Sequence, residues 1–403
     1  MFARLSAVLA LVVCGACGGS DATTAADAPD VDAVDAGAPR DGAIITSAPI
    51  AASAPKSGWF HTRGRDIVDS QGNVVRLTGI NWFGLETATF APHGLWARPL
   101  EAYLDDVREL GYNVLRIPFS TQMLDAASVP STIDYTKNPS LKEKRPIELL
   151  DAIVAGARAR GLRVIIDRHR PHSSALSPLW YTDQYSEGRF IDDWRSLAKR
   201  YHDDPTVIGF DLHNEPHGAA TWGSGDTATD WRLAAERTGA AIQEINPELL
   251  VIVEGVETVD GKGTWWGGNL RAAGRAPVRL PVLNHVVYSP HEYPASVAAQ
   301  PWFSAPDYPA NLARLWEEEW AYLVTREIAP VWIGELGTKY ETDSDRVWLA
   351  TLAETISRTN MSFAYWALNP DSSDTGGILK DDWLTRDMRK QSVILPLLAP
   401  PLQ

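Results

Sequence analysis

The chain has 403 residues, enough for one large catalytic domain or two ordinary ones, and its 45% hydrophobic and 22% charged residues are typical of a soluble globular protein. The formal net charge of −14 disfavours nucleic acid, anionic lipid and polyanionic sugars as partners, so a neutral or cationic substrate is favoured. The 16 Trp residues can serve either as core residues or as flat surfaces that stack on sugar rings.

The N-terminal segment is predicted to be an export signal. Residues 1–17 contain an apolar run, Leu5–Val13, that is too short to span a bilayer as a helix, followed by small residues. Gly15-Ala16-Cys17 is similar to a bacterial lipobox, although Cys14 stands where Leu is usual, and Cys17 would then carry the lipid. We expect an exported protein that is lipid-anchored to the cell envelope, with ordinary cleavage and full release as the alternative.

Residues 18–57 are predicted to be a disordered tether. They are rich in Ala, Asp, Pro, Gly, Ser and Thr and contain no aromatic residue, so they cannot bury enough apolar surface to offset chain entropy. A flexible coil of this length has an r.m.s. reach of roughly 35 Å. A single catalytic domain is expected over residues 58–403, without an internal repeat or a second folded module.

The folded part is predicted to begin with a β-hairpin and to continue with alternating strands and helices. Phe60-His61-Thr62 and residues 74–77 flank the polar turn 69–73, which predicts the hairpin. Apolar stripes at helical spacing, ended by Gly111 and Gly161, predict the first two helices. The predicted strands are Leu77–Trp82, Asn113–Phe119, Leu162–Asp167, Val207–Leu212, Leu249–Glu254, His285–His291, Val331–Glu335 and Ser362–Trp366.

These strands predict an α/β fold of the (β/α)8 TIM-barrel type. They are apolar runs without strict alternation, as expected when helices cover the outer face of a parallel sheet. An open doubly wound sheet would alternate in the same way, but no Gly-rich phosphate loop follows the first strand. In a barrel the reactive groups lie at the C-terminal ends of the strands.

Two of the predicted strand ends stand out among those that carry a carboxylate. Strand four ends in His213-Asn214-Glu215-Pro216, and strand seven ends in Gly334-Glu335-Leu336-Gly337. Strands four and seven lie across the barrel mouth from each other, so Glu215 and Glu335 can converge on one bond. Glycoside cleavage needs two carboxylic acids in different protonation states, held about 5 Å apart in a retaining enzyme. Taken alone, Asn-Glu-Pro after a strand could equally be a helix N-cap with an acidic first turn.

Further motifs lie in order along the chain. They are GINWFG, HGLW, RIPF, DRHRP, LHNEP, SPHEY, WIGELG and YWALNPDSSDTGGILKDDW. Together they resemble glycoside hydrolase family 5, and most of all its bacterial endo-β-1,4-glucanases (cellulases). The resemblance covers about residues 57–398 and implies a β-glucan polysaccharide or oligosaccharide as substrate, with no cofactor.

The resemblance implies roles for two sets of residues. Glu215 matches the general acid/base and Glu335 the nucleophile, and Tyr293 is expected to donate to Glu335. The other implied catalytic residues are Arg116 beside the nucleophile, His169, Asn214 at the sugar 2-OH, and His291 near Glu215. The implied substrate-binding residues are Asn81, Trp82, Trp265, Trp266, Gln300 and Trp366.

Each of these residues also has a structural alternative. Arg116 could be an ion-pair partner, since a fixed cation both neutralises a buried carboxylate and favours its ionised form. His169, His291 and Tyr293 could be core residues with satisfied polar groups, and Trp265 could pack in the core like any large aromatic residue, as could Trp266.

The expected mechanism is double displacement. Protonated Glu215 gives a proton to the leaving oxygen while Glu335 attacks the anomeric carbon. Water activated by Glu215 then hydrolyses the glycosyl-enzyme, and the anomeric configuration is retained. The enzyme is expected to act as a monomer, to have no nucleic-acid partner, and to meet a membrane only through its N-terminal lipid.

Three alternatives stay open. Within the family, the residues around the reacting sugar are shared with endo-β-mannanases and other β-glycanases. A sugar-binding lipoprotein could keep the barrel and have lost catalysis. A metal-dependent hydrolase is suggested by His169-x-x-His172 and His213-x-x-x-His217, but a strand places residues i and i+2 on one face, so neither spacing fits a ligand pair.

Overall fold

The computed structural model describes residues 55–402, which belong to one compact unit. The predicted export signal, the lipidation site Cys17 and the tether up to residue 54 lie outside the described residues. Within residues 55–402, none of the helices combines the length and the hydropathy that crossing a membrane requires.

A parallel sheet closes into the predicted barrel. Its hydrogen-bonded order is β11-β8-β7-β6-β5-β4-β14-β13-β12. The strands are β4 (Thr78–Asn81), β5 (Val114–Ser120), β6 (Arg163–Arg170), β7 (Val207–Asp211), β8 (Leu250–Glu254), β11 (Val286–Ser289), β12 (His291–Glu292), β13 (Trp332–Leu336) and β14 (Ser362–Tyr365). β11 and β12 are halves of one strand, separated by Pro290, which has no N–H to give to a ladder. Because β11 pairs with β8 and β12 with β13, this strand closes the ring, and all eight predicted barrel strands are confirmed.

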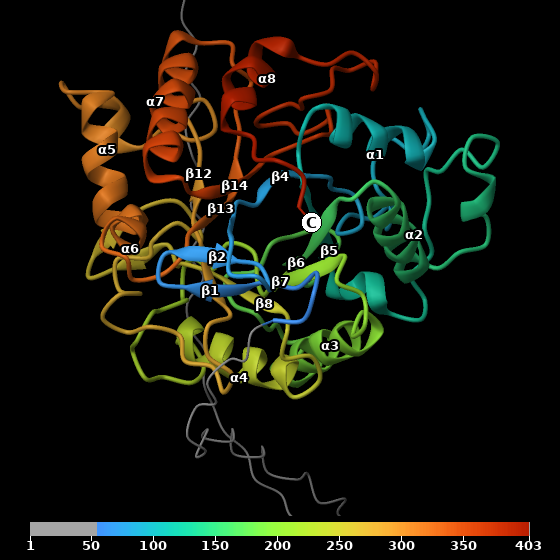
Figure 1. Cartoon of the computed structure of the whole chain (residues 1–403), viewed down its shortest axis with the longest axis horizontal. Coiled ribbons are helices and arrows are strands. Elements are labelled where there is room, and N and C mark those ends of the chain that lie inside the picture. The colour runs from blue at the N-terminus through green and yellow to red at the C-terminus, as the bar shows by residue number, and fades with distance from the viewer. Residues whose placement is uncertain (1–54, 403) are drawn as a thin grey trace, which may run out of the picture. The chain divides into compact units, whose positions relative to one another are not determined.

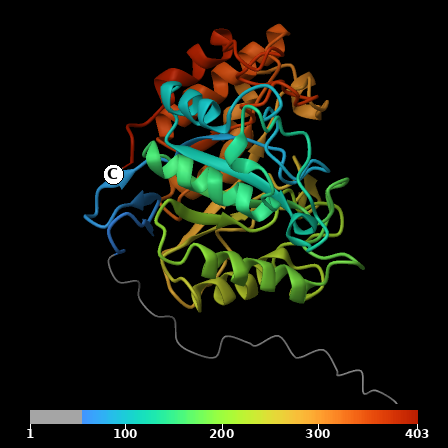
Figure 2. The same ribbon diagram turned by 90° about the vertical axis from the view of Figure 1, so that its right-hand side faces the viewer.

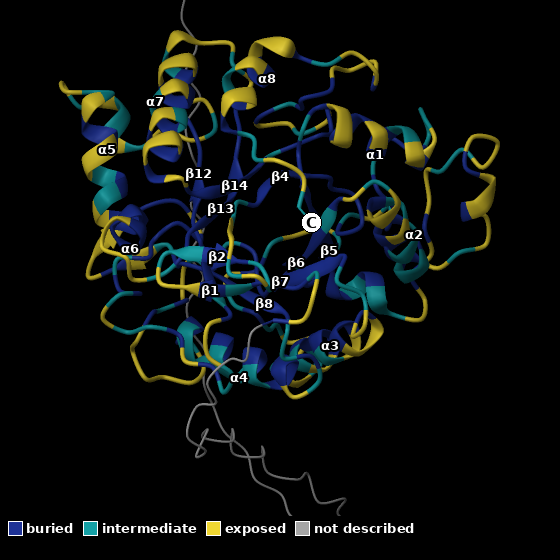
Figure 3. Ribbon diagram, viewed as in Figure 1, coloured by how far each residue is buried: buried dark blue, intermediate teal, exposed yellow. Residues whose placement is uncertain are grey.

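Helices surround the strands, as Figures 1 and 2 show. They are α1 (Leu100–Glu109), α2 (Pro146–Ala159), α3 (Glu187–Arg200), α4 (Trp231–Gln243), α5 (Ala310–Trp316), α6 (Tyr322–Thr325), α7 (Asp343–Thr359) and α8 (Met388–Ile394), with a π-helical turn η4 (Glu317–Ala321) between α5 and α6. Short 3-10 turns are η1 (Thr121–Leu124), η2 (Pro139–Leu141), η3 (Pro301–Ser304) and η5 (Leu395–Leu397). Figure 3 shows buried strands inside helices whose outer faces are exposed, which explains why the strand sequences are continuous apolar runs.

The connection after β8 departs from the expected eight β/α units. Among residues 255–285 the structure has only the two-residue strands β9 (Thr258–Val259) and β10 (Lys262–Gly263), and no helix. This segment is rich in Gly and contains two prolines, which disfavour a helix interior. The expectation of a helix at every connection is therefore wrong here, and the loop instead carries Trp265 and Trp266.

The N-terminal hairpin prediction is right about the turn and wrong about one strand. The turn 69–73 joins β2 (Asp66–Val68) to β3 (Val74–Val75), and β1 (His61–Arg63) pairs with β2 on its other side. Asp69 Oδ1 accepts the backbone N–H groups of Gln71 and Asn73, both at 2.9 Å, which fixes the turn. A second turn at residues 64–65, centred on Gly64 with φ 57°, makes three strands where two were expected.

This small sheet packs against one end of the barrel core. Phe60 and Ile67 join an apolar cluster with barrel residues that include Val114, Ile165 and Ile252. Two residues further along the same three strands lie Arg116, Asp167 and Glu254, all fully buried. Because alternate residues of a strand face the same side, the apolar layer directly supports a polar layer above it.

Candidate active site

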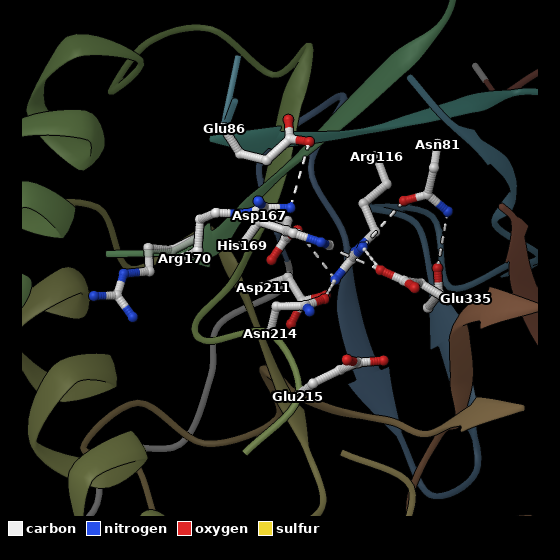
Figure 4. Close-up of polar contacts among 12 residues, drawn as sticks. Asn81, Glu86, Arg116, Asp167, His169, Arg170, Asp211, Asn214, Glu215 and Glu335 are labelled. Carbon is white, nitrogen blue, oxygen red and sulfur yellow. Dashed lines mark hydrogen bonds and ion pairs between the residues drawn. The ribbon is translucent and has the colours of Figure 1, made fainter. Parts of the chain in front are cut away.

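The guanidinium of Arg116 lies within hydrogen-bond distance of four buried carboxylates from four different strands. Figure 4 shows three of them, Asp167, Asp211 and Glu335. The contacts are Nη1 to Glu335 Oε1 at 2.7 Å, Nε to Asp211 Oδ2 at 2.9 Å, and Nη2 to Asp167 Oδ2 and Glu254 Oε1, each at 3.2 Å. All five donors of an arginine fork can be used in such a centre, which a lysine could not reproduce. Despite burial, the four carboxylates hold the pKa of Arg116 well above its usual value.

Glu335, at the end of β13, is surrounded by groups that favour its ionised form. Tyr293 donates its hydroxyl to Glu335 Oε2, and His169 Nδ1 lies 3.9 Å from Oε1. Burial by itself raises the pKa of Glu335, but His291 and Arg116 outweigh it and hold this pKa below its usual value. A buried carboxylate that stays ionised can act as a nucleophile.

Glu215 follows β7 and has an unusual backbone. Its φ is 54°, in the left-handed region that non-glycine residues seldom adopt and that is often found at functional sites. Its N–H donates to Glu254 Oε2 at 2.7 Å, and His217 Nδ1 lies 2.6 Å from its carbonyl oxygen. The side chain is 16% exposed, against 4% for that of Glu335, so Glu215 is the carboxyl nearer to solvent.

The two carboxyl groups converge. One oxygen of Glu215, one of Glu335 and a ring nitrogen of His291 all lie within 4.8 Å of one another. This separation matches the roughly 5 Å spacing of retaining glycosidases and is shorter than the roughly 6.5–9.5 Å of inverting ones. Chemically, the arrangement can place one ionised and one proton-carrying carboxyl on a single bond.

His291 lies between the two carboxyl groups. Its Nδ1 is 3.1 Å from Glu215 Oε1 and 3.7 Å from Glu335 Oε2. Burial works against a charged ring, but Glu254 and Glu335 raise the pKa of His291 well above its ordinary value. Gly334 makes room for the ring, because a Cβ at that position would lie 3.1 Å from His291 Nε2 and 2.5 Å from Ser289 Oγ.

The carboxyls beneath the pair hold protons more readily. Burial, opposed by Arg116, raises the pKa of Asp167 to about 7 and that of Asp211 to about 6. His169 lies with Nδ1 2.7 Å from Asp167 Oδ2, and burial lowers its pKa to about 4, so its ring is neutral. Negative charge is therefore concentrated on Glu335 among the acids around Arg116.

Asn214 has an unused donor. Its Oδ1 accepts Arg116 Nη2 at 2.9 Å, which fixes the orientation of the amide. Its Nδ2 is buried and finds no hydrogen-bond partner within the described residues. A buried polar group without a partner is costly, so a ligand that accepts from this nitrogen would be favoured.

Trp366, which follows β14, is half-buried beside His169. Its indole is nearly parallel to the imidazole of His169, at a centroid distance of 5.2 Å and an angle of 11°. It is also nearly parallel to the Phe83 ring, at 5.4 Å and 9°. Its Nε1 donates to Ser372 Oγ at 3.2 Å, so the plane of the indole is fixed next to the carboxyl pair.

Two predicted substrate-binding residues, Asn81 and Trp82, are buried in the structure. Asn81 is fully buried, with Nδ2 donating to the Gly334 carbonyl at 3.1 Å and Oδ1 accepting from Arg116 at 3.1 Å, so it orients the guanidinium. Trp82 is 1% exposed and packs on Tyr103 at a centroid distance of 5.2 Å, so its predicted contact with a sugar stays a prediction. Asn81 is the last residue of β4 and Trp82 follows it, at a strand end where sequence alone does not determine whether a side chain points into the mouth or into the core.

The tryptophan pair divides between core and surface. Trp265 is 7% exposed and packs on Tyr293 at a centroid distance of 5.9 Å, an environment that favours its core alternative, and its stacking role stays a prediction. Trp266 is 41% exposed and lies parallel to His217 at 3.8 Å, which places an accessible indole beside the Glu215 backbone. Gln300 is half-buried, and its carbonyl accepts the Phe303 N–H at 3.1 Å at the start of η3; its predicted role stays a prediction.

The histidines of the metal-site alternative have separate partners. His169 lies beside Asp167, His172 packs on Tyr185, and His213 Nδ1 lies 2.9 Å from Arg168 Nη1. Asp167, Asp211 and Glu254 place oxygens within 4.8 Å of one another, but the guanidinium of Arg116 already occupies the space that they face. These two sets of side chains therefore do not fit a metal ion.

Sequence reasoning missed two of the acids in this centre. Asp211 and Glu254 lie in predicted strands, but neither was predicted to be a site residue. Both occupy the last position of an apolar strand and are spaced by two from inward-facing residues, and this is the signal that could have found them. A buried acid at such a position needs a cation, and Arg116 on β5 supplies it.

Comparisons with known proteins agree with this geometry. The model for cellulase (glycosyl hydrolase family 5) matches residues 68–372. An endoglucanase of Paenibacillus polymyxa is 48% identical over 87% of this chain and 90% of its own length. The major extracellular endoglucanase of Xanthomonas campestris pv. campestris is 38% identical over 88% of this chain and 74% of its own length.

Solved structures give the same picture. A hyperthermophilic endocellulase from Pyrococcus horikoshii matches with a TM-score of 0.81 and 38% identity, covering 85% of this chain and 100% of that one. A variant of that endocellulase is known in complex with cellotetraose. The catalytic domain of the Xanthomonas endoglucanase matches with a TM-score of 0.81 and 37% identity, covering 84% of this chain and 99% of that one.

Proposed function

The chain belongs to glycosyl hydrolase family 5, and we propose that it cleaves β-1,4-glucan chains internally with retention of anomeric configuration. The observation that carries this proposal is the approach of Glu215 and Glu335 to within 4.8 Å at the ends of β7 and β13. Relatives named endoglucanases, which align over most of the chain, support β-1,4-glucan as substrate over mannan.

In the first step Glu335 is the nucleophile and Glu215 the general acid. Glu335 attacks the anomeric carbon, and the bond from that carbon to the leaving oxygen breaks as Glu215 transfers its proton to this oxygen. The lowered pKa of Glu335 keeps the attacking oxygen ionised. Tyr293 and Arg116 hold one oxygen each and so orient the carboxylate for attack.

In the second step Glu215, now ionised, acts as general base. It takes a proton from a water molecule whose oxygen attacks the anomeric carbon, and the bond to Glu335 breaks. Two inversions at one carbon give net retention. His291, 3.1 Å from Glu215 Oε1, faces the carboxyl group that alternately loses and regains the proton.

Two further side chains are proposed to bind the reacting sugar. Asn214 Nδ2, which is unpaired within the described residues, would donate to the 2-OH, an interaction that strengthens in the transition state. Trp366 would carry the apolar face of the ring, since its plane is already fixed beside His169.

We propose that the enzyme works outside the cell, as its Xanthomonas relative does by name. The signal-like N-terminus supports export, and the lipobox-like sequence supports attachment through Cys17. Metabolic labelling with a palmitate analogue tests this attachment, because a Cys17→Ser variant should lose the label while keeping hydrolytic activity.

Product analysis tests the proposed function directly. Proton NMR during hydrolysis of cellotetraose should show the β-anomer of the new reducing end first, followed by mutarotation. On a soluble cellulose derivative, viscosity should fall faster than reducing ends appear, because cuts are internal. Initial release of the α-anomer, or faster hydrolysis of mannan than of β-1,4-glucan, would contradict the proposal.

A Glu215→Ala variant should hydrolyse cellotetraose about 10²–10⁴-fold more slowly, which is the range of general acid–base contributions. Sodium azide should partly restore turnover of a dinitrophenyl cellobioside, because a good leaving group needs no acid and azide needs no base to attack the glycosyl-enzyme. The product should be the β-glycosyl azide. Absence of azide rescue would argue against the acid/base role of Glu215.

A Trp266→Ala variant should raise KM for cello-oligosaccharides about 3–10-fold with little change in kcat, as expected if an exposed indole contributes roughly 0.5–1.5 kcal/mol of stacking. Michaelis constants measured on oligosaccharides of increasing length would show this. Leu283→Ala is a matched control, since Leu283 is 40% exposed on the connection that enters β11 at the opposite end of the barrel. An unchanged KM would exclude Trp266 from substrate binding.

A further inference from the structure

Glu254, the last residue of β8, contacts three parts of the active site at once. Its Oε2 accepts the backbone N–H of Glu215 at 2.7 Å. Its Oε1 accepts Arg116 Nη2 at 3.2 Å and lies 3.2 Å from His291 Nε2. The side chain is fully buried, so no water competes for these contacts.

The contacts of Glu254 suit a carboxylate and no neutral substitute. A backbone N–H and a guanidinium always carry their protons, so each oxygen faces a permanent donor. A glutamine would turn an NH2 group toward one of these donors and lose that contact. Burial raises the pKa of Glu254 well above its ordinary value, and His291 and Arg116 oppose this rise, so the assignment of its role stands on the geometry of these contacts.

The loop after β8 is built closely around this carboxylate. A Cβ at Gly267 would lie 2.3 Å from Glu254 Oε2 and 3.1 Å from Glu215 Cα. Gly267 also has φ 68°, which a side chain would strain. Its N–H donates to the Pro216 carbonyl at 3.2 Å, so the same loop holds the segment that carries Glu215.

Glu215 needs such a support because its own backbone is strained. A φ of 54° persists in a residue with a Cβ only where surrounding contacts hold it. Glu254 holds the N–H side of Glu215, while His217 holds the carbonyl side at 2.6 Å. Loss of the Glu254 contact would let the backbone relax and move the carboxyl away from the bond that it must protonate.

The second route from Glu254 to Glu215 passes through His291. One ring nitrogen faces Glu254 Oε1 at 3.2 Å, and the other faces Glu215 Oε1 at 3.1 Å. The approach of Glu254 to Nε2 holds the ring in place, and with it the Nδ1 that faces Glu215. Glu254 therefore sets both the place of Glu215 and the hydrogen bond that its reacting carboxyl receives.

We propose that Glu254 is a positioning residue for proton donation: it holds Glu215 by the backbone and through His291, and so governs protonation of the leaving oxygen. This inference rests on the proposed function, in which Glu215 is the general acid. It predicts a selective defect that depends on how much the leaving group needs a proton.

The test compares two substrates on one preparation of a Glu254→Gln variant. On cellotetraose, whose leaving group needs a proton, kcat/KM should fall about 30–100-fold, within the range of acid-catalysis effects. On 2,4-dinitrophenyl cellobioside, whose leaving group departs unprotonated, kcat/KM should fall less than about 5-fold. The ratio of the two values does not depend on the folded fraction, so partial unfolding does not imitate the effect.

Asp211→Asn is the matched control. Asp211 is buried at the same guanidinium, 2.9 Å from Arg116 Nε, and among the described ion pairs it contacts neither Glu215 nor His291. Loss of the Asp211 carboxylate should lower kcat/KM for both substrates by similar factors. Glu254→Asp, which keeps the charge but is too short to reach both sides, should reproduce the selective defect and covers the case in which Glu254→Gln does not fold.

Equal losses on both substrates in Glu254→Gln and Glu254→Asp, or no loss in either, would overturn the inference. Failure of the wild-type enzyme to hydrolyse cellotetraose would instead overturn the proposed function, so the two failures are distinguishable. A pH profile adds a second readout, because a purely structural defect would leave the limb that reports Glu215 in place.

Discussion

Turnover of cellotetraose falls on the order of 10⁵-fold in a Glu335→Gln variant, the scale on which removal of a nucleophile acts in enzymes with covalent intermediates. The amide is nearly isosteric but cannot form the bond to the anomeric carbon. Stopped assays of reducing-end release, with binding of cellotetraose measured by calorimetry on the same sample, separate lost chemistry from lost binding. Binding should persist, because the neighbouring groups that hold the sugar are unchanged.

Azide distinguishes the two carboxyls by stereochemistry. In Glu335→Ala, azide takes the place of the missing nucleophile and attacks a dinitrophenyl cellobioside from the face opposite the leaving group, giving the α-glycosyl azide. In Glu215→Ala the glycosyl-enzyme forms first and azide then gives the β-glycosyl azide. Formation of the same anomer by both variants, or near-normal turnover of Glu335→Gln, would show that the nucleophile lies elsewhere.

The sequence was sufficient to predict the strands and the position of the reacting carboxyls. Barrel strands are buried on both faces, so they stand out as apolar runs, and the residue at each C-terminal end has a defined place at the mouth. Glu215 and Glu335 were found for this reason, and their motifs supported the choice. The broken strand at Pro290 did not disturb the count, because its two halves together fill one place in the barrel, β11 pairing with β8 and β12 with β13.

The features that the sequence did not predict are the directions of side chains, whereas the positions of the residues along the strands were predicted. Trp82 and Asn81 follow the same strand, yet one packs under α1 and the other reaches Arg116. Trp265 and Trp266 are adjacent, and only the second is exposed. Adjacent side chains point in different directions in both cases. Which of the two is buried depends on the tertiary packing around them, which the local sequence pattern does not specify.

The acids around Arg116 illustrate the same limit. Asp211 and Glu254 look like the polar ends of apolar strands, and a pairing between strands that are far apart in sequence appears only when the barrel closes. The cost of burying them without a cation is several kcal/mol for each charge. The fold therefore depends on a side chain that the chemistry also uses, and this makes Arg116 the most sensitive residue of the site.

An Arg116→Met variant should lose essentially all activity and about 3–5 kcal/mol of unfolding free energy at neutral pH, the cost of leaving a buried charge without its partner. The loss of stability should depend on pH. Without the guanidinium the pKa of Asp167, already about 7, and that of Asp211, already about 6, rise further through burial. The wild-type fold already meets this cost up to its own folded pKa values, so the deficit of the variant relative to wild type should grow as pH rises above about 6.

Denaturant unfolding of wild type and variant at several pH values measures this deficit, and Arg168→Met provides the control. Arg168 is as deeply buried one residue beyond Asp167, but it hydrogen-bonds neutral groups, Thr121 Oγ1 at 3.1 Å and His213 Nδ1 at 2.9 Å. Burial lowers its pKa to about 9, which shows how differently a guanidinium behaves without close carboxylates. The Arg168→Met deficit should therefore change much less with pH. A pH-independent deficit in Arg116→Met would mean that the acids below the catalytic pair are protonated with or without Arg116, and that its charge serves Glu335 alone.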